Sequence, residues 1–190
     1  MQMSGEHRIE APREAVWAAL NDPEILKQAI PGCEEIEKVS DTELAAKVKV
    51  KVGPVSANFS GTVTLSDLDP PRGYTISGQG KGGPAGFAKG GAKVRLEEDG
   101  AATILYYDVE ARVGGKLAQI GSRLIDATAK KMANDFFARF AEVVGGLAPE
   151  EPAALPAAEE AAPAGAVRPL FWALGVIAIV LVLLAIFGLN

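Results

Sequence analysis

The sequence predicts an α+β domain followed by a membrane-spanning segment, and three patterns support this. Stretches between residues 44 and 113 alternate apolar and polar side chains, as antiparallel strands with one buried face do. Apolar residues with helical spacing then run from about Lys116 to Val144. Finally, Leu170 to Leu189 contains no charge, no proline and no amide, and about 20 such residues of helix span roughly 30 Å of hydrocarbon.

The amino-terminal part predicts one strand and two short helices. Residues Met3–Ile9 are a short strand candidate. Pro12 then precedes a helix over Arg13–Leu20, because the fixed φ of proline suits a helix start. The sequence Asn-Asp-Pro at 21–23 ends this helix and caps a second one over Glu24–Ile30.

After the first strand and the two helices, about six further strands are expected, and five stretches there alternate clearly. Their inward-facing residues are Leu44, Ala46, Val48, Val50 and Val52; Ala57, Phe59, Gly61, Val63 and Leu65; Tyr74, Ile76 and Gly78; Ala92, Val94 and Leu96; and Leu105, Tyr107, Val109, Ala111 and Val113. Between the third and fourth stretches lies a glycine-rich segment, Gly78 to Gly91, which reads as a hairpin with bulges or as a flexible flap.

The long helix is expected to bury one apolar stripe against the curved inner face of the sheet. The stripe consists of Leu117, Ile120, Leu124, Thr128, Met132, Phe136, Phe140 and Val143, widened by Ile125 and Phe137. Gly145 and Gly146 end the helix. We therefore expect a domain over residues 1–147, a flexible linker rich in Ala, Pro and Glu over 148–168, and a transmembrane tail anchor over 169–190.

Composition excludes several function classes. The net charge is −5, but four of the 24 acidic residues lie in the linker, so the domain is nearly neutral and no general nucleic-acid binder. The only cysteine is Cys33, expected to be a small buried thiol, and the only histidine is His7, expected at a surface or sheet edge. No metal site and no catalytic constellation is therefore expected.

The amino terminus has no apolar stretch typical of a secretory signal, and Arg168 precedes the anchor. Both features favour a domain that faces the cytoplasm from the cytoplasmic membrane.

The letters Gly-x-Gly-x-x-Gly at 78–83 are followed by another strand and not by a helix, which argues against dinucleotide binding. The alternate lysines Lys47, Lys49 and Lys51 are either a solvated face or a contact for anionic lipid or an acidic partner.

Glycine at inward positions is the most informative feature of the sheet. Gly61, Gly78 and Gly80 mark either bends in a strongly curved sheet or missing side-chain volume. The facing helix supplies Phe and Met, which are adaptable apolar walls. We expect an apolar cavity between sheet and helix, with a filled core as the alternative.

The sequence resembles the family of the carbon monoxide dehydrogenase G subunit, which belongs to the START-like (SRPBCC) helix-grip superfamily. The residues that carry the resemblance are APREAVWAALNDPEIL at 11–26, IPGCEEIEKV at 30–39, VKVKVGPVSANFSGTVTLSDLDPP at 48–71, GGPAGFAKGGAKVRL at 82–96 and VGGKLAQIGSRLID at 113–126. The resemblance implies a helix-grip fold with an internal cavity. It also implies an accessory protein, not an enzyme, whose partner is a molybdenum hydroxylase of the carbon monoxide dehydrogenase type.

We expect a membrane-tethered carrier of a hydrophobic ligand, most plausibly a respiratory quinone (menaquinone or ubiquinone) exchanged with the membrane pool. The alternative is a docking factor that recruits the dehydrogenase to the membrane with its core filled; an enzyme on the same fold is a third class. The glycine-rich stretch 82–91 would be the portal. The candidate ligand-binding residues are Phe59, Gly61, Ile76, Gly78, Phe87, Tyr107, Leu124, Thr128, Met132 and Phe136.

Overall fold

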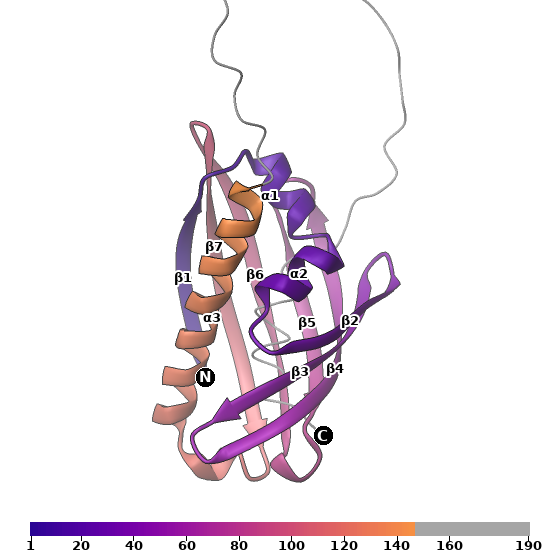
Figure 1. The fold of residues 1–190 in the computed structure, drawn as a ribbon, viewed down its shortest axis with the longest axis vertical. Coiled ribbons are helices and arrows are strands. Elements are labelled where there is room, and N and C mark those ends of the chain that lie inside the picture. Colours follow the sequence, from indigo (N-terminus) through magenta and orange to yellow (C-terminus); the bar gives the residue numbers. More distant parts are fainter. Residues whose placement is uncertain (147–190) are drawn as a thin grey trace, which may run out of the picture.

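The computed structural model describes residues 1–146, which form one antiparallel sheet with helices on one of its faces (Figure 1). The seven strands lie in the order β1-β7-β6-β5-β4-β3-β2, so β1 and β2 are the two edges. The elements are β1 (Gln2–Ile9), α1 (Arg13–Ala19), α2 (Pro23–Ala29), β2 (Cys33–Ser40), β3 (Glu43–Val52), β4 (Val55–Asp69), β5 (Gly73–Lys81), η1 (Gly83–Ala85), β6 (Phe87–Asp99), β7 (Ala102–Gly114), η2 (Ala118–Ile120) and α3 (Ser122–Gly145).

The helix α3 lies across the inner face of the sheet, and α1 and α2 pack beside its upper half (Figure 1). Asp22 begins α2 as predicted, since its carboxylate accepts the N–H of Glu24 at 2.8 Å. Trp17, Leu20 and Leu26 from these short helices are buried in the same apolar cluster as the inner face of the sheet. One continuous core therefore joins all three helices to the sheet.

The predicted strands are confirmed, and alternation places their side chains correctly. In β3 the side chains of Leu44, Ala46, Val48, Val50 and Val52 are all buried, whereas Lys49 and Lys51 between them are exposed. The strands are longer than the predicted stretches; β6, for example, begins at Phe87, where Gly90 and Gly91 interrupt the apolar alternation.

About six strands were expected after the two helices, and residues 1–146 contain six there, but alternation did not locate one of them, β2. The edge strand β2 pairs with β3 through contacts such as Ile36 opposite Ala46. Its sequence, CEEIEKVS, has no buried residue and only Cys33 and Ile36 half-buried. An edge strand needs no apolar face to pair, so hydrophobic periodicity could not reveal it.

The register of the long helix differs from the prediction. The helix begins at Ser122 and not at Lys116, because η2 and Gly121, at φ +97°, interrupt the chain before it. The buried face consists of Ile125, Ala129, Met132, Ala133, Phe136, Phe137, Phe140 and Val144. Leu124, Thr128 and Val143, which were predicted to be buried, lie beside this face and are exposed or half-buried. The predicted stripe crosses the helix surface at an angle to the face that is buried.

The two ends of the sheet differ in what they contain. The lower end in Figure 1 holds the β3–β4 turn, the β5–β6 connection through η1, and the start of α3. The upper end holds α1, the β6–β7 turn and the last residues of α3.

Among the helices of residues 1–146, none combines the length and the apolar character that a membrane span requires. The predicted linker (148–168) and tail anchor (169–190) lie outside the described residues.

Candidate ligand-binding interior

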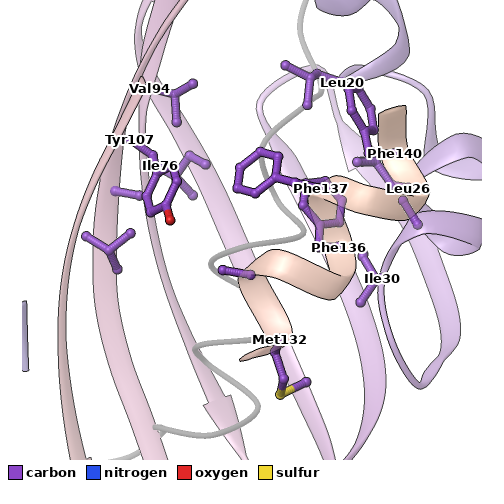
Figure 2. Packing of buried hydrophobic residues seen from close by; sticks show 14 of the residues in the cluster. Leu20, Leu26, Ile30, Ile76, Val94, Tyr107, Met132, Phe136, Phe137 and Phe140 are labelled. Atoms are coloured by element: carbon purple, nitrogen blue, oxygen red, sulfur yellow. The ribbon is translucent and has the colours of Figure 1, made fainter. Parts of the chain in front are cut away.

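The candidate site is the apolar cluster formed by side chains of the inner face of the sheet and of α3. Figure 2 shows Ile76, Val94 and Tyr107 of the sheet facing Phe136 and Phe137 of the helix. The helix presents a row of aromatic rings: Phe136 lies 5.0 Å from Phe137 and 5.5 Å from Phe140, measured between ring centroids. Such rings offer large apolar surfaces to whatever fills the space beside them.

Half of the predicted ligand-binding residues lie together in this interior. Phe59, Ile76, Tyr107, Met132 and Phe136 all belong to the buried cluster, and Met132 is the most exposed of them at 8%. They come from β4, β5, β7 and α3, which are brought together only by the curvature of the sheet. The alternation in the strands and the spacing in the helix were sufficient to find them.

The inward glycine Gly61 is explained by the close approach of a neighbouring strand. A Cβ atom on Gly61 would lie 2.4 Å from the carbonyl oxygen of Gln79 and 2.9 Å from the Cα of Gly80. Backbone atoms cannot yield as a flexible side chain can, so a larger residue at Gly61 would strain β4 and β5. This glycine is therefore no evidence of missing side-chain volume, and the bend stays a prediction. Gly78 lies half-buried at the next inward position after Ile76.

Leu124 and Thr128 lie at the lower end of α3, outside the buried cluster. Leu124 is 41% exposed, and its Cδ2 atom lies 2.8 Å from the position of a Cβ on Gly53, so it covers the β3–β4 turn. The hydroxyl of Thr128 donates to the carbonyl of Leu124 at 2.8 Å and is therefore engaged within the helix. These two residues border the lower end of the domain and do not line its centre.

The structure does not bring Phe87 into the interior. In β6 the buried residues Ala88, Ala92 and Val94 face inward, so Phe87 shares the outer face with Lys89. Its ring lies over Gly114 of β7, where an added Cβ would clash with the ring of Phe87. Phe87 therefore lies outside the apolar cluster, and its contact with a ligand or with the bilayer stays a prediction.

The glycine-rich segment forms a defined connection between β5 and β6. It consists of the end of β5, the short helix η1 and the start of β6, which confirms the hairpin interpretation. The N–H of Leu117 donates to the carbonyl of Ala85 at 3.0 Å, and both side chains are buried. Phe59 covers Gly82, where an added Cβ would clash with its ring. The segment is thus fastened to both β4 and the approach to α3.

Five buried side-chain polar atoms have no hydrogen-bond partner within the described residues, and two of them belong to the apolar cluster. These two are the hydroxyl of Tyr74 and the indole N–H of Trp17, whose rings meet edge to face at 5.2 Å. Burial raises the pKa of Tyr74 well above its ordinary value, so this hydroxyl stays protonated and can donate. The sequence placed Tyr74 on an inward face but marked neither residue as a polar contact; an inward-facing tyrosine was the available signal.

His7 also faces inward. It lies on the edge strand β1, as expected, but its ring stacks on Phe137 at 3.9 Å and lies 6.0 Å from Tyr107. Burial lowers the pKa of His7 and raises that of Tyr107, so both side chains are held neutral. Gly5 leaves room for the Tyr107 hydroxyl, since an added Cβ there would clash with that oxygen. The rings of His7, Tyr107 and Phe137 therefore pack together between the edge strand β1 and α3.

Three other features of the described residues were considered as sites: a hollow on the outer face, possible metal ligands and the thiol of Cys33. An open hollow of about 1300 Å³ on the outer face of the sheet mixes Arg13, Asp69, Arg95 and Asp108, which suits no apolar ligand. In the part of the chain that the structure describes, no three His, Cys, Asp or Glu residues are grouped to hold a metal. Cys33 is half-buried, and burial raises the pKa of its thiol, which makes it a poor nucleophile.

Solved structures share this fold. A conserved protein from Geobacillus kaustophilus aligns with a TM-score of 0.72 and 29% identity, over 77% of this chain and 96% of that one. A protein from Thermus thermophilus aligns with a TM-score of 0.60 and 14% identity, over 77% and 99% of the two chains. An aromatase/cyclase from Streptomyces sp. R1128 aligns with a TM-score of 0.55 and 16% identity, over 76% and 93%. These neighbours are START-like helix-grip proteins.

No match was found among curated protein sequences. The model of one protein family, described as the G subunit of carbon monoxide dehydrogenase (CoxG), matches residues 5–145, which is nearly the whole described domain. The match covers every strand but the first residues of β1, and it ends with α3. The chain therefore belongs to the CoxG family, named for the G subunit of carbon monoxide dehydrogenase.

Proposed function

We propose that this chain is a membrane-tethered accessory protein that carries a hydrophobic ligand, a respiratory quinone, to a molybdenum hydroxylase of the carbon monoxide dehydrogenase type. The observation that carries the proposal is the apolar interior enclosed by the inner face of the sheet and the phenylalanine-bearing face of α3. The family name supports the partner, because it describes a subunit of that dehydrogenase. A quinone partitions into the bilayer and needs a carrier to reach a soluble enzyme.

The buried polar groups fit this class of ligand. A quinone head group is flat, apolar on both faces and carries two carbonyl oxygens that accept hydrogen bonds. The hydroxyl of Tyr74 and the indole N–H of Trp17 are donors without a partner in the described part of the chain. An unpaired buried donor costs free energy that a ligand carbonyl would recover. These two residues are therefore our candidates for contacts to the head group.

The tether is proposed from the sequence. Leu170 to Leu189 is long and apolar enough to span the cytoplasmic membrane, and Arg168 before it favours a domain in the cytoplasm. A linker of about 20 residues in an extended conformation, at about 3.1 Å per residue, reaches roughly 60 Å. The domain is a carrier and not an enzyme in this proposal, and its partner oxidises the substrate.

The test is mass spectrometry of an organic extract of residues 1–147 purified from the native host. A stoichiometric quinone is expected. Met132→Trp, which fills the interior without burying a charge, should lower the quinone content several-fold. The control Val39→Ser, at a side chain that is 59% exposed on β2, should leave the content unchanged.

An empty wild-type domain that still binds the dehydrogenase would refute the carrier function and leave recruitment to the membrane as the role. Equal quinone content in the wild type and in a folded Met132→Trp variant would refute the interior as the site. Circular dichroism and urea unfolding of each variant separate loss of ligand from loss of fold.

A further inference from the structure

The lower end of the domain carries an unusual set of exposed cations. They lie on β3, β5, β6 and β7, beyond the end of β7, and in the first turn of α3. We call this set the basic end; its members are Lys49, Lys51, Lys81, Lys89, Arg112, Lys116 and Arg123.

The strand register brings these cations to one place. Lys89 of β6 lies directly opposite Arg112 of β7, and Lys81 of β5 lies opposite Phe87, two residues before Lys89. Lys51 is the next-to-last residue of β3, beside the turn to β4 at the same end. The cations therefore spread across neighbouring strands and are not confined to one loop.

Carboxylates are scarce around them. The chain contains no Asp or Glu over residues 44–66 or 70–96, which supply most of this end of the sheet. The carboxylates nearby are few: Glu110 on β7 accepts a hydrogen bond from Gln2 at 2.7 Å, Glu34 on β2 accepts one from Asn58, the residue opposite Lys49, and Asp126 follows on α3. Within residues 1–146, none of the seven cations forms an ion pair, whereas Arg8, Lys47 and Arg72 do.

Apolar side chains accompany the cations. Leu124 is 41% exposed against the β3–β4 turn, and the half-buried ring of Phe87 lies on the outer face beside Lys81 and Lys89. Cations surrounding a few exposed apolar side chains suit the surface of an anionic bilayer, where head groups attract the charges and the apolar groups enter the interface.

We propose that the basic end docks the domain onto an anionic lipid surface. A bilayer is favoured over an acidic protein because the predicted span at Leu170–Leu189 keeps a bilayer close to every copy of the domain. The inference rests on the tether in the proposed function but not on the identity of the carried ligand.

The length of the chain permits this docking. The helix α3 has 24 residues, so it carries the chain about 36 Å away from the basic end before the linker begins. The linker reaches roughly 60 Å, which is enough to return along the domain to the membrane. The basic end can therefore face the bilayer although the anchor is attached at the opposite end.

The test uses residues 1–147, which contain the complete core and match almost the full length of the Geobacillus protein. Vesicles of phosphatidylcholine alone are compared with vesicles that also contain phosphatidylglycerol, by flotation at low and high salt. Binding is expected only to the anionic vesicles, and high salt should release it.

The decisive variant changes Lys81, Lys89 and Arg112 to Gln. At roughly fivefold per cation, its affinity for anionic vesicles should fall about 100-fold. The matched control changes Lys27, Lys130 and Arg139 to Gln, which alters the net charge equally at exposed positions elsewhere. The control should bind at nearly wild-type strength.

Equal losses in the two triple variants, or equal binding to both kinds of vesicle, would overturn the proposal. Loss of dehydrogenase binding with vesicle binding intact in the Lys81, Lys89 and Arg112 variant would instead assign the basic end to a protein partner. Quinone content in the same variant should stay unchanged, so failure of docking and failure of ligand carriage are distinguished.

Discussion

The substitution Gly61→Ala separates the two explanations of the inward glycines. If Gly61 provides space for a ligand, a methyl group should fit and weaken only ligand binding. If the glycine is required by the approach of β5, the methyl group should strain the sheet whether or not a ligand is present. The structure favours strain, because the new Cβ would lie 2.4 Å from the carbonyl oxygen of Gln79 and 2.9 Å from the Cα of Gly80.

The expected magnitude follows from these distances. An ordinary carbon–oxygen contact is about 3.4 Å or longer, so β4 and β5 must separate by close to 1 Å or the carbon must enter a repulsive contact. Overpacking of this kind costs about 1–3 kcal/mol. Gly61→Ala should therefore lower the free energy of unfolding of residues 1–147 by that amount, measured by urea unfolding without ligand.

The matched control is Gly145→Ala near the end of α3, where a Cβ would have no neighbour within 4 Å. Alanine is a better helix former than glycine, so this change should be neutral or stabilise the domain by up to about 1 kcal/mol. Equal stability of Gly61→Ala and the wild type, together with loss of bound ligand, would refute the strain argument and restore the cavity interpretation of this glycine.

Three further predictions concern the interior. Phe136→Ala, at a fully buried ring, should lower the free energy of unfolding by about 3–5 kcal/mol in urea titrations, and a loss below about 1 kcal/mol would show that the ring is not packed. Because burial lowers the pKa of His7 below its ordinary 6.5, the unfolded chain takes up a proton that the folded domain resists, so stability should decrease as the pH falls below about 6.5. The His7→Gln variant should lose this part of the pH dependence, and an unchanged profile would contradict the assignment. Tyr74→Phe removes an unpaired buried hydroxyl, so it should leave the ligand-free domain as stable or more stable and reduce quinone retention; retention equal to wild type would exclude the proposed contact.

Much of the fold could be predicted because the sheet has one apolar face. Alternation in β3 to β7 located the strands and their inward residues, and it found Phe59, Ile76 and Tyr107. The same rule could have placed Phe87 correctly: counting back from Ala92 in steps of two reaches Ala88, which leaves Phe87 on the opposite face. The glycines that surround Phe87 hid this register, since they carry no side chain that marks a face.

The rest depended on information that periodicity does not contain. Leu124, Thr128 and Val143 have the spacing of a buried stripe, but which side of α3 faces the sheet is set by tertiary packing. The pairing of the Tyr74 and Trp17 rings joins β5 to α1, which are distant in sequence. The inward orientation of His7 depends on β1 joining β7 at the sheet edge. None of these contacts is local in the chain.

The charged edge strand β2 has a consequence for how copies of the domain meet. Open strand edges invite pairing with the strands of another molecule, and charged side chains and irregular pairing discourage it. β2 presents Glu34, Glu35, Glu37 and Lys38, and its pairing with β3 shifts register twice, between Cys33 and Glu35 and between Lys38 and Ser40. A second sheet approaching this edge would have to bury those charges against an interrupted ladder. Copies of the domain would therefore resist pairing with one another through the β2 edge.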